Sequence, residues 1–395
     1  MVELLYLLLP VAFYAGWRAS RKSLFQSQKQ QRKLSDNFVK GINFLLSEEP
    51  DKALEVFLNN QDIDEYTAET YQLLGNLFRD RGEVDRALRV HQNLISRPSL
   101  NAEQKQKAMF LLGKDFFSAG MLDRAESVFR ELLNDSSLSR RVSKALICAA
   151  LRTIYEQTQE WQKAIEATEC YSKNNTENSN TVKSESKKLI AHYYCELADE
   201  ALHQGKLNKV DDLLLKAKKS FKHSTRLMTL EGDIAYHQKN YKGALKYYSK
   251  AIKEDTRLLS MLFTQLEESA KSTANIDILK SDLLKMYQKK KDKSVFETLL
   301  ILAKKYNGSA DIDALIEAEL STQRLNIESI YRASDYTINS VNTLDDKHGL
   351  LLVNQALGSY LNGVPAFRCE HCGYKMHDYL WRCPACHEWD SIDHA

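Results

Sequence analysis

The chain has 395 residues, enough for two or three ordinary domains or for one extended repeat array. With 55 Lys and Arg against 53 Asp and Glu, its near-neutral charge argues against a dedicated nucleic-acid-binding protein, and its 43% hydrophobic residues exclude wholesale disorder. Its 14 Gly and 5 Pro are about half and about a quarter of average usage, so the chain lacks the turn residues of a barrel or sandwich and is expected to be mostly helical.

The first predicted element is a single transmembrane helix, an anchor over residues 1–20. Its core, residues 4–17, reads LLYLLLPVAFYAGW, a short span that local thinning of the bilayer would accommodate. Three basic residues follow this run within positions 18–22, whereas a secretory signal peptide carries them before it. By the positive-inside rule the rest of the chain stays in the cytoplasm, beginning with a polar linker over residues 21–33. The alternative to an anchor is a helix buried in the protein core.

A repeat pattern runs through residues 34–256. A small residue is followed three positions later by a large apolar one, twelve positions later by Ala, and four positions after that by another aromatic or large residue. The copies begin at Gly41, Gly75, Gly113, Arg152, Ala198 and Gly232. Two of the intervals are 34 residues, which with this pattern is typical of tetratricopeptide (TPR) repeats. Small residues let the two helices of a hairpin approach closely, and stacked hairpins form a curved solenoid with a concave binding surface.

Two regions depart from this repeat. Residues 171–186 (YSKNNTENSNTVKSES) have no apolar period and are expected to form a polar loop. Residues 257–365 keep a helical pattern while the repeat decays, so we predict degenerate TPR-like hairpins there, for example at 295–306 and 349–361. Within this region the basic run 285–293 is interpreted as a solvated helix face, with contact to anionic lipid or an acidic partner as the alternative.

The last predicted domain is a rubredoxin-like metal-binding ribbon over residues 366–395. Its cysteines follow C-x2-C-x10-C-x2-C, and we assign all four as ligands of one metal ion: Cys369, Cys372, Cys383 and Cys386. So small a domain cannot build an adequate core, and metal binding would supply folding free energy directly. The ion is Fe or Zn, which the ligand set does not distinguish. Four cysteines close the shell, which leaves no open position for hydrolytic catalysis.

Histidines and aromatic residues surround these cysteines. His371, His377 and His387 are alternative ligands, but the complete set of four cysteines favours surface or supporting roles for them. The aromatic residues are expected to pack the ribbon against the helical array: Tyr374, Tyr379, Trp381 and Trp389.

The other cysteines, Cys148, Cys170 and Cys195, are scattered through apolar helical patterns and are expected to be buried packing residues. Seven cysteines so unevenly spread do not form a disulfide framework, and clustered ligand pairs require a reducing compartment or a bound metal. The sequence contains no Walker loop, no G-x-S-x-G and no H-E-x-x-H motif, and we predict that the protein is not an enzyme. The fold class expected is therefore all-α, a TPR and TPR-like superhelical solenoid with an N-terminal anchor and a C-terminal ribbon.

In this order, the segments resemble the lipopolysaccharide assembly protein B family of Gram-negative bacteria over nearly the full length. The resemblance is carried by MVELLYLLLPVAFYAGW, GINFLLSEEPDKALEVF, LGNLFRDRGEVDRALRVHQ, AHYYCELA and YLWRCPACHEW. It implies an inner-membrane protein with a cytoplasmic TPR body and a rubredoxin-like domain packed against that body. The metal ligands of the family correspond to the same four cysteines.

The resemblance also implies a function and partners. The family acts as an adaptor for the membrane ATP-dependent protease FtsH, and it favours degradation of the deacetylase that commits precursors to lipid A. An inner-membrane protein that senses lipopolysaccharide regulates members of the family. The chain is also compatible with a homodimer. The competing hypotheses are a rubredoxin-like electron-transfer protein and a scaffold that gathers lipopolysaccharide assembly enzymes.

Overall fold

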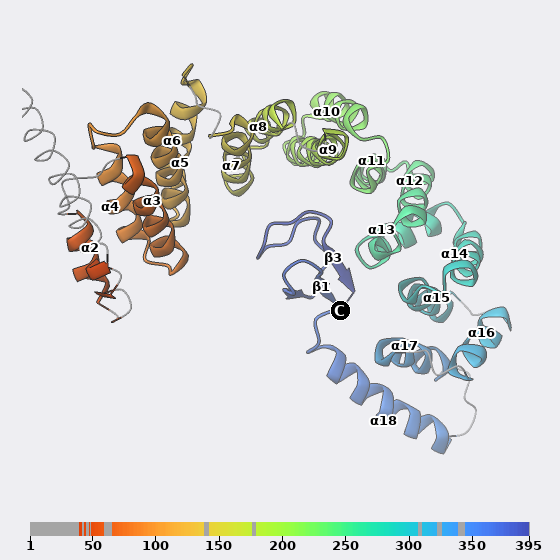
Figure 1. Ribbon diagram of the computed structural model, residues 1–395. Coiled ribbons are helices and arrows are strands. Elements are labelled where there is room, and N and C mark those ends of the chain that lie inside the picture. The colour runs from red at the N-terminus through yellow and green to blue at the C-terminus, as the bar shows by residue number, and fades with distance from the viewer. Residues whose placement is uncertain are drawn as a thin grey trace, which may run out of the picture. The chain divides into compact units, whose positions relative to one another are not determined.

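The computed structural model describes residues 39–394 except positions 42, 45, 46 and 48 and the segments 59–64, 138–141, 176–178, 307–309, 322–325 and 339–343. The described chain consists of helices followed by a small sheet (Figure 1). It divides into two compact units, Met1–Val182 and Lys183–Ala395. The predicted anchor (1–20) and linker (21–33) lie outside the described residues. Of the helices that are described, none has the length and apolar character needed to cross a membrane.

The first unit is a series of helical hairpins, as the repeats predict. Within it α3 packs against α4, α5 against α6, and α7 against α8. A capping box starts α5: the side chain of Asn101 accepts a hydrogen bond from the backbone N–H of Gln104, whose own side chain accepts one from Asn101 N–H. The helices described in this unit are α2 (Pro50–Leu58), α3 (Glu65–Asp80), α4 (Val84–Ile95), α5 (Ala102–Ser118), α6 (Leu122–Asn134), α7 (Lys144–Gln157) and α8 (Trp161–Asn174).

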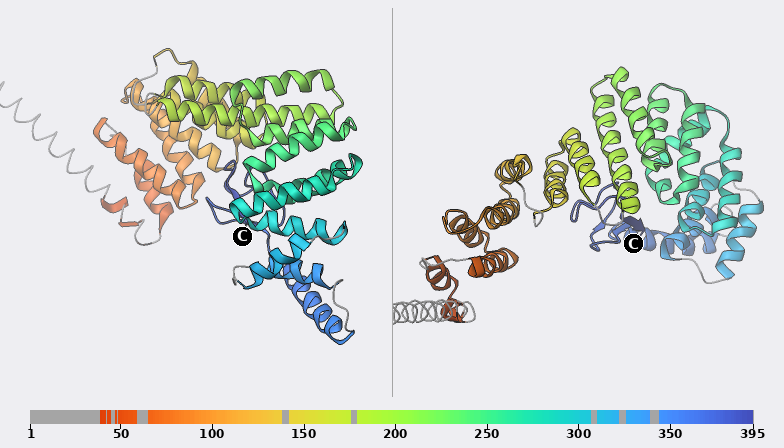
Figure 2. Two further views of the ribbon diagram at one scale, coloured as in Figure 1. Left: turned by 90° about the vertical axis from the view of Figure 1, so that its right-hand side faces the viewer. Right: turned by 45° about the horizontal axis from the view of Figure 1, so that its top comes forward.

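The second unit continues the pattern of hairpins and ends in the ribbon. Its helices follow one another in an arc in Figure 1, and the stacked layers are seen from two further sides in Figure 2. They are α9 (Ser179–His203), α10 (Leu207–Ser220), α11 (Thr225–His237), α12 (Tyr241–Glu254), the 3-10 helix η1 (Thr256–Leu258), α13 (Leu259–Ser272), α14 (Ile276–Lys290), α15 (Lys293–Lys305), α16 (Ala310–Ser321), α17 (Ile327–Thr337) and α18 (Leu344–Leu361). The helical prediction for residues 257–365 is thus confirmed for the parts of that range that the structure describes.

The small residues of the repeat lie where the two helices of a hairpin cross. A Cβ atom at Gly113 would lie 2.6 Å from the ring of Phe129, and one at Gly232 would lie 2.4 Å from the ring of Tyr248. In both copies the ring is sixteen positions after the glycine, where the pattern places a large residue. The packing reason predicted for the spacing is therefore confirmed: the ring on the second helix rests directly against the backbone of the first.

In the copy that begins at Gly75, this ring belongs to a histidine. His91 is fully buried, lies against Gly75 and pairs through Nδ1 with the buried carboxylate of Asp115. Arg79 donates a hydrogen bond to the other carboxylate oxygen of Asp115, at 2.7 Å. A charge is tolerated in a protein interior when it is paired and hydrogen-bonded, so this network joins α3, α4 and α5 without an orphaned ion.

The turns inside the hairpins use a left-handed backbone conformation. Glycine supplies it at Gly82, Gly120 and Gly205, with φ of 79°, 72° and 70°. The corresponding turns of other hairpins place non-glycine residues there, at Gln159, Lys239 and Ala274, with φ of 58°, 60° and 55°. This conformation costs an L-residue about 1–2 kcal/mol, so these turns are held by the packing of the helices that they join.

The predicted polar loop over 171–186 is wrong. α8 continues to Asn174 and α9 begins at Ser179, so most of the segment is helical. The first turns of α9 are exposed nearly all round, and such turns have no buried stripe to generate an apolar period. The sequence therefore showed the absence of burial, which is not the same as the absence of a helix.

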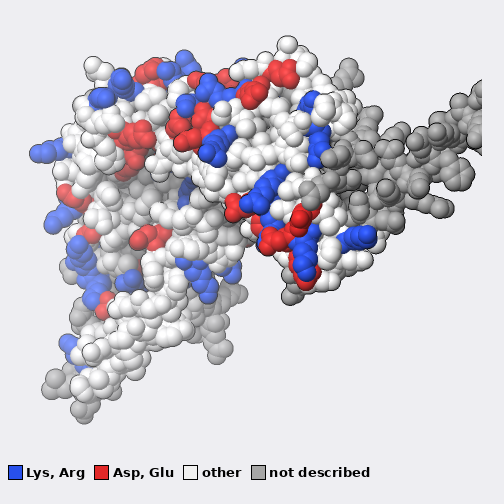
Figure 3. All heavy atoms as spheres, turned by 90° about the vertical axis from the view of Figure 1, so that its left-hand side faces the viewer, with Lys and Arg blue, Asp and Glu red and all other residues white. Residues whose placement is uncertain are grey.

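The two degenerate segments singled out at 295–306 and 349–361 differ in burial. Most of α15 is buried. By contrast α18 leaves Leu351, Leu352 and Val353 about half exposed, at 45%, 56% and 53%. On the face drawn in Figure 3, Lys and Arg are interspersed with Asp and Glu over the described residues.

The cysteine predictions for the helical body hold in part. Cys195 on α9 is fully buried, as expected, and burial raises the pKa of its thiol to about 12. Cys148 on α7 is also fully buried, as expected, but Cys170 on α8 is only half-buried, and the two are joined by a disulfide bond that the prediction did not include. The pairing could not be read from the chain because the two residues are 22 positions apart and meet only when the hairpin closes.

Candidate metal centre

Three short strands frame the ribbon. They are β1 (Phe367–Cys369), β2 (Lys375–Met376) and β3 (Ile392–His394), in the order β2-β1-β3 with both pairings antiparallel. In the register, Phe367 faces Met376 on one side and His394 on the other, and Cys369 faces Ile392. Cys369 thus ends the central strand and starts the first C-x2-C turn.

The two C-x2-C turns have the same local geometry. In the first, the N–H of Gly373 donates to the carbonyl of Cys369 at 2.9 Å, and Gly373 has a φ of 77°. In the second, the N–H of His387 donates to the carbonyl of Cys383 at 3.0 Å, and His387 has a φ of 62°. His387 therefore occupies in the second turn the position that Gly373 has in the first, and both residues have a positive φ.

The turns bring all four predicted sulfurs together. The Sγ atoms of Cys369 and Cys386 are 3.6 Å apart, and those of Cys372 and Cys383 are 3.7 Å apart. All four lie within 4.8 Å of one another. A tetrahedral ion with metal–sulfur bonds of about 2.3 Å requires sulfurs about 3.8 Å apart. The four cysteines therefore fit a single tetrahedral metal ion.

The electrostatics of the sulfurs favour a bound cation. Burial raises the pKa of the Cys369 thiol, but hydrogen bonds from the Ser391 hydroxyl and from backbone N–H groups of Cys372 and His371 outweigh it and hold that pKa at about 6. Burial and the surrounding sulfurs raise the pKa of the Cys386 thiol to about 12. Four thiolates cannot share this space without a positive charge between them, and a metal ion supplies one.

None of the three predicted alternative ligands joins this cluster. His371 and His377 are exposed, His387 is half-buried in its turn, and the group of metal-ligating atoms found among the described residues consists of the four cysteine sulfurs. One sulfur, that of Cys372, belongs to an exposed residue. The complete cysteine set makes an imidazole ligand unnecessary.

The ribbon docks on the inner side of the arc formed by the second unit, as Figure 1 shows. Tyr379 and Trp381 are 6% and 8% exposed and belong to the hydrophobic core that also contains helices α12 to α15, and Trp389 packs at its edge. The prediction that the aromatic face packs on the array is confirmed for these three residues. It is wrong for Tyr374, which is 47% exposed.

A partly buried cluster of polar and charged side chains fastens one end of the ribbon to α9. The carboxylate of Asp390 accepts a hydrogen bond from Nε2 of His192 at 3.0 Å and pairs with Nζ of Lys188 at 2.8 Å. Burial alone would raise the pKa of the Asp390 carboxyl, but His192 and Lys188 hold it well below its usual range. The His192 ring also stacks on Trp389, with centroids 4.8 Å apart.

Three further helical segments hold the rest of the ribbon. On α11, the guanidinium of Arg226 lies over the ring of Trp381 at 5.2 Å. Arg257 of η1 donates to the carbonyl of Ile392 at 3.0 Å, and Ser294 of α15 is 2.6 Å from Nε2 of His394. Sequence reasoning missed these partners. In the sequence, Arg226, Arg257 and Ser294 cannot be told from ordinary surface residues, because only the folded ribbon brings their partners to them.

Comparisons with known families and relatives agree with these assignments. Residues 367–394 match the family described as a rubredoxin metal binding domain, and residues 70–104 match the tetratricopeptide repeat. Lipopolysaccharide assembly protein B of Escherichia coli is 32% identical over 393 residues, covering 99% of this chain and 98% of that protein. The protein of the same name from Haemophilus influenzae is 30% identical over 401 residues, with the same coverage.

Among solved structures, a crystal structure of MamA aligns with 49% of this chain and 94% of its own, with 18% identity and a TM-score of 0.33. A tetratricopeptide repeat protein from Parabacteroides merdae aligns with 73% of this chain and 99% of its own, with 14% identity and a TM-score of 0.34.

Proposed function

The chain belongs to the lipopolysaccharide assembly protein B family, and from that premise we propose that it is a non-enzymatic inner-membrane adaptor that regulates lipopolysaccharide synthesis. Its proposed partners are the membrane protease FtsH, the deacetylase that commits precursors to lipid A, and an inner-membrane protein that senses lipopolysaccharide. In this proposal residues 1–20 hold the protein at the membrane and the helical body lies on the cytoplasmic side.

The observation that carries the proposal is the docked ribbon. A domain held by four cysteines is fixed to the inner side of a stack of helical hairpins by contacts to α9, α11, η1 and α15. Hairpin stacks of this kind bind partners along extended concave surfaces. A metal-dependent brace on that surface suits a protein whose task is to hold partners in a defined geometry.

The proposed role of the membrane anchor is to raise local concentration. Confining the adaptor and the protease to one thin layer increases their encounter without new contacts, so that moderate affinity for the deacetylase suffices. In the four-cysteine site we propose one Fe or Zn ion, whose chemistry there is structural: it neutralises the thiolates and fixes the two turns.

The test is the half-life of the deacetylase in cells that contain the full chain, no chain, or a chain lacking residues 1–22. We expect rapid turnover only with the full chain, while the truncated protein folds but fails to promote turnover. Normal turnover by the truncated protein would refute the tethering argument. A half-life that does not change when the protein is absent would replace the adaptor by a scaffold for assembly enzymes.

A second candidate function is electron transfer, which the exposed position of Cys372 favours because a solvent-facing ligand shortens the path to a redox partner. It requires bound iron that is reduced and reoxidised reversibly. Metal analysis followed by a reduction titration separates the two: zinc in the native protein, or full regulation by zinc-substituted protein, removes this candidate.

A further inference from the structure

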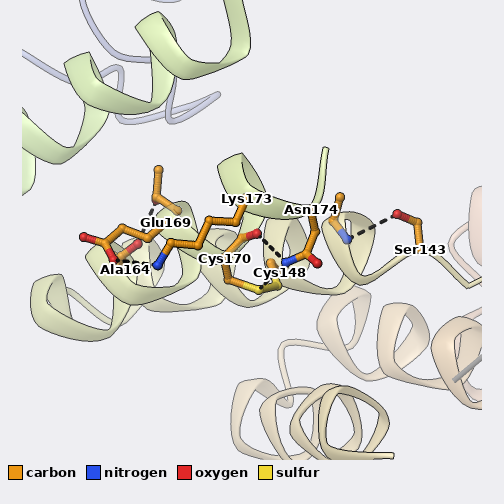
Figure 4. The surroundings of a disulfide bond; sticks show 9 residues. Ser143, Cys148, Ala164, Glu169, Cys170, Lys173 and Asn174 are labelled. Carbon is orange, nitrogen blue, oxygen red and sulfur yellow. Dashed lines mark hydrogen bonds and ion pairs between the residues drawn. A yellow bond between two sulfur atoms is a disulfide. The ribbon is translucent and has the colours of Figure 1, made fainter. Parts of the chain in front are cut away.

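The disulfide between Cys148 and Cys170 lies at the open end of the α7–α8 hairpin. Cys148 is in the second turn of α7 and Cys170 is in the last turns of α8, with Cα atoms 5.9 Å apart (Figure 4). The other end of the hairpin is closed by the turn at Gln159. The disulfide therefore joins the two helices at the end of the hairpin that lies opposite the turn. This hairpin is the last one before the boundary between the two units, which follows Val182.

The two sulfurs differ in access. Cys148 is fully buried, whereas Cys170 is half-buried. Asn174 lies one turn after Cys170, and its side-chain amide donates to the Cys170 carbonyl at 2.8 Å and lies 3.7 Å from the Cys170 sulfur. Because Cys148 is fully buried, a small thiol arriving from solvent meets Cys170 first. In the reduced pair, the Asn174 N–H group beside the Cys170 sulfur stabilises the Cys170 thiolate, which is the attacking group in oxidation.

The remaining cysteines do not compete for this chemistry. The four ribbon cysteines are gathered in the candidate metal centre, where a bound ion protects thiolates from oxidation. The thiol of Cys195 is fully buried and its pKa is raised to about 12, so it is protonated and out of reach.

We propose that Cys148 and Cys170 are a reversible thiol–disulfide pair that exchanges with a low-molecular-weight disulfide such as that of glutathione, through Cys170. In oxidation, the Cys170 thiolate attacks glutathione disulfide, which releases one glutathione thiolate and leaves a mixed disulfide on Cys170. The Cys148 thiolate then attacks the Cys170 sulfur and displaces the second glutathione. The two protons of the protein thiols pass to the released glutathiones. Reduction is the reverse, and glutathione thiolate first attacks the Cys170 sulfur.

The consequence of the bond is a hairpin that opens less readily. Cross-linking residues 22 positions apart removes conformational freedom from the opened state, while the closed hairpin is unchanged. The pair would thus couple the local stability of the last hairpin of the first unit to the thiol redox state around it. This inference does not depend on the proposed adaptor function, and its test does not measure deacetylase turnover.

The first experiment titrates the zinc-loaded full chain, in detergent, with mixtures of reduced and oxidised glutathione. Free thiols are trapped by alkylation and peptides are quantified by mass spectrometry, so that residues 148 and 170 are followed separately from the ribbon. We expect the 148–170 link to form and open reversibly, with Cys170 the first to be alkylated or glutathionylated. A pair that stays reduced in excess oxidised glutathione, a link that resists excess reduced glutathione, or earlier modification of Cys148 would each overturn the proposal.

The second experiment measures amide hydrogen exchange in α7 and α8 at both ends of that titration. Oxidation should slow exchange there by roughly tenfold or more. Cys170→Ser should abolish this redox dependence, and Cys148→Ser should do the same if Cys170→Ser does not fold. Cys195→Ser, which removes a thiol outside the pair, is the matched control and should keep it. Equal exchange in the oxidised and reduced protein would contradict the stabilising role.

Discussion

Glu297 shows how a single buried side chain is tuned by its surroundings. It lies on α15, is 8% exposed and accepts a hydrogen bond from the Ser329 hydroxyl at 2.9 Å. Burial, together with the charge of Glu328, raises the pKa of its carboxyl to about 7, while Lys293 and Arg332 act in the opposite direction. The folded protein therefore keeps a proton on Glu297 at a pH at which the unfolded chain has lost it.

This shift predicts a pH-dependent stability. Because the unfolded chain releases the proton first, the free energy of unfolding should fall as pH rises from about 4.5 to about 7, by at most about 3 kcal/mol. Glu297→Gln should remove this dependence and stabilise the protein at pH 8, as measured by thermal unfolding at pH 5 and pH 8. Glu317→Gln, at an exposed position of α16, is the control and should leave the dependence in place. The same dependence in Glu297→Gln as in the native chain would assign it to another group.

At Gly232, a single added methyl group tests the close packing of helices in the repeats. The Tyr248 ring that it faces is fully buried, and its hydroxyl donates to Asp233 at 2.8 Å, so the ring cannot move aside. Gly232→Ala should destabilise the protein by about 1–3 kcal/mol in denaturant unfolding. Gly349→Ala, on α18, adds a methyl group where no described atom lies within 4 Å and should stabilise by about 0.5–1 kcal/mol through helix propensity. Equal effects of the two changes would contradict the steric account.

At the scale of the element, the hairpin turns place L-residues where glycine is preferred. Ala274 has a φ of 55° between α13 and α14. Gly205, between α9 and α10, has a φ of 70°, and no described atom lies within 4 Å of the position that an added methyl group would take. Backbone conformation, and not crowding, therefore decides which residue suits these turns.

Reciprocal substitutions test this point. Ala274→Gly should stabilise the second unit by about 0.5–1 kcal/mol, since relief of the left-handed cost exceeds the extra entropy of the unfolded glycine. Gly205→Ala should destabilise it by about 1 kcal/mol for the converse reason. Thermal unfolding of the two variants, compared with the native chain, measures both. A loss of stability in Ala274→Gly would mean that the alanine methyl makes contacts that outweigh its backbone strain.

At the scale of the whole molecule, the ribbon and the helices of the second unit share one hydrophobic core. Phe367, Trp381 and Ile392 belong to the same buried cluster as Leu262 of α13 and Leu299 of α15. The fold of the ribbon depends on its metal ion in our proposal, so the loss of the ion should also uncover the inner side of the arc.

Removal of the metal is therefore expected to destabilise the helices as well as the ribbon. A strong chelator, or Cys383→Ser, should lower the thermal midpoint of unfolding by roughly 5 °C or more and shift tryptophan fluorescence to longer wavelength. His192→Ala should weaken docking while the metal content stays complete, which separates docking from ligation. An unchanged helical midpoint after complete metal loss would show that the ribbon is not a brace.

The repeat, the ligand spacing and the aromatic face were predictable because each is local. Gly113 and Phe129 belong to one hairpin, and the four cysteines lie within 18 residues, so position along the chain nearly determines position in space. The same local reasoning failed at 171–186, where the exposed helical turns carry no apolar stripe. It also failed at Tyr374, which is aromatic like the packed residues Tyr379 and Trp381 but is exposed to solvent.

Tertiary structure alone decided which distant residues meet. His192 and Asp390 are 198 positions apart, and Cys148 and Cys170 are joined across a hairpin, so no period or spacing identifies either pair. The two cysteines meet where the packing of α7 against α8 sets the helices in register. The partner of Asp390 depends on the curvature of the helical stack and on the course of the ribbon across it, which result from many weak packing contacts. Helix formation and ligand clustering depend on neighbours a few residues away. Docking depends on the whole arc, and for that reason its contacts are found only in the folded chain.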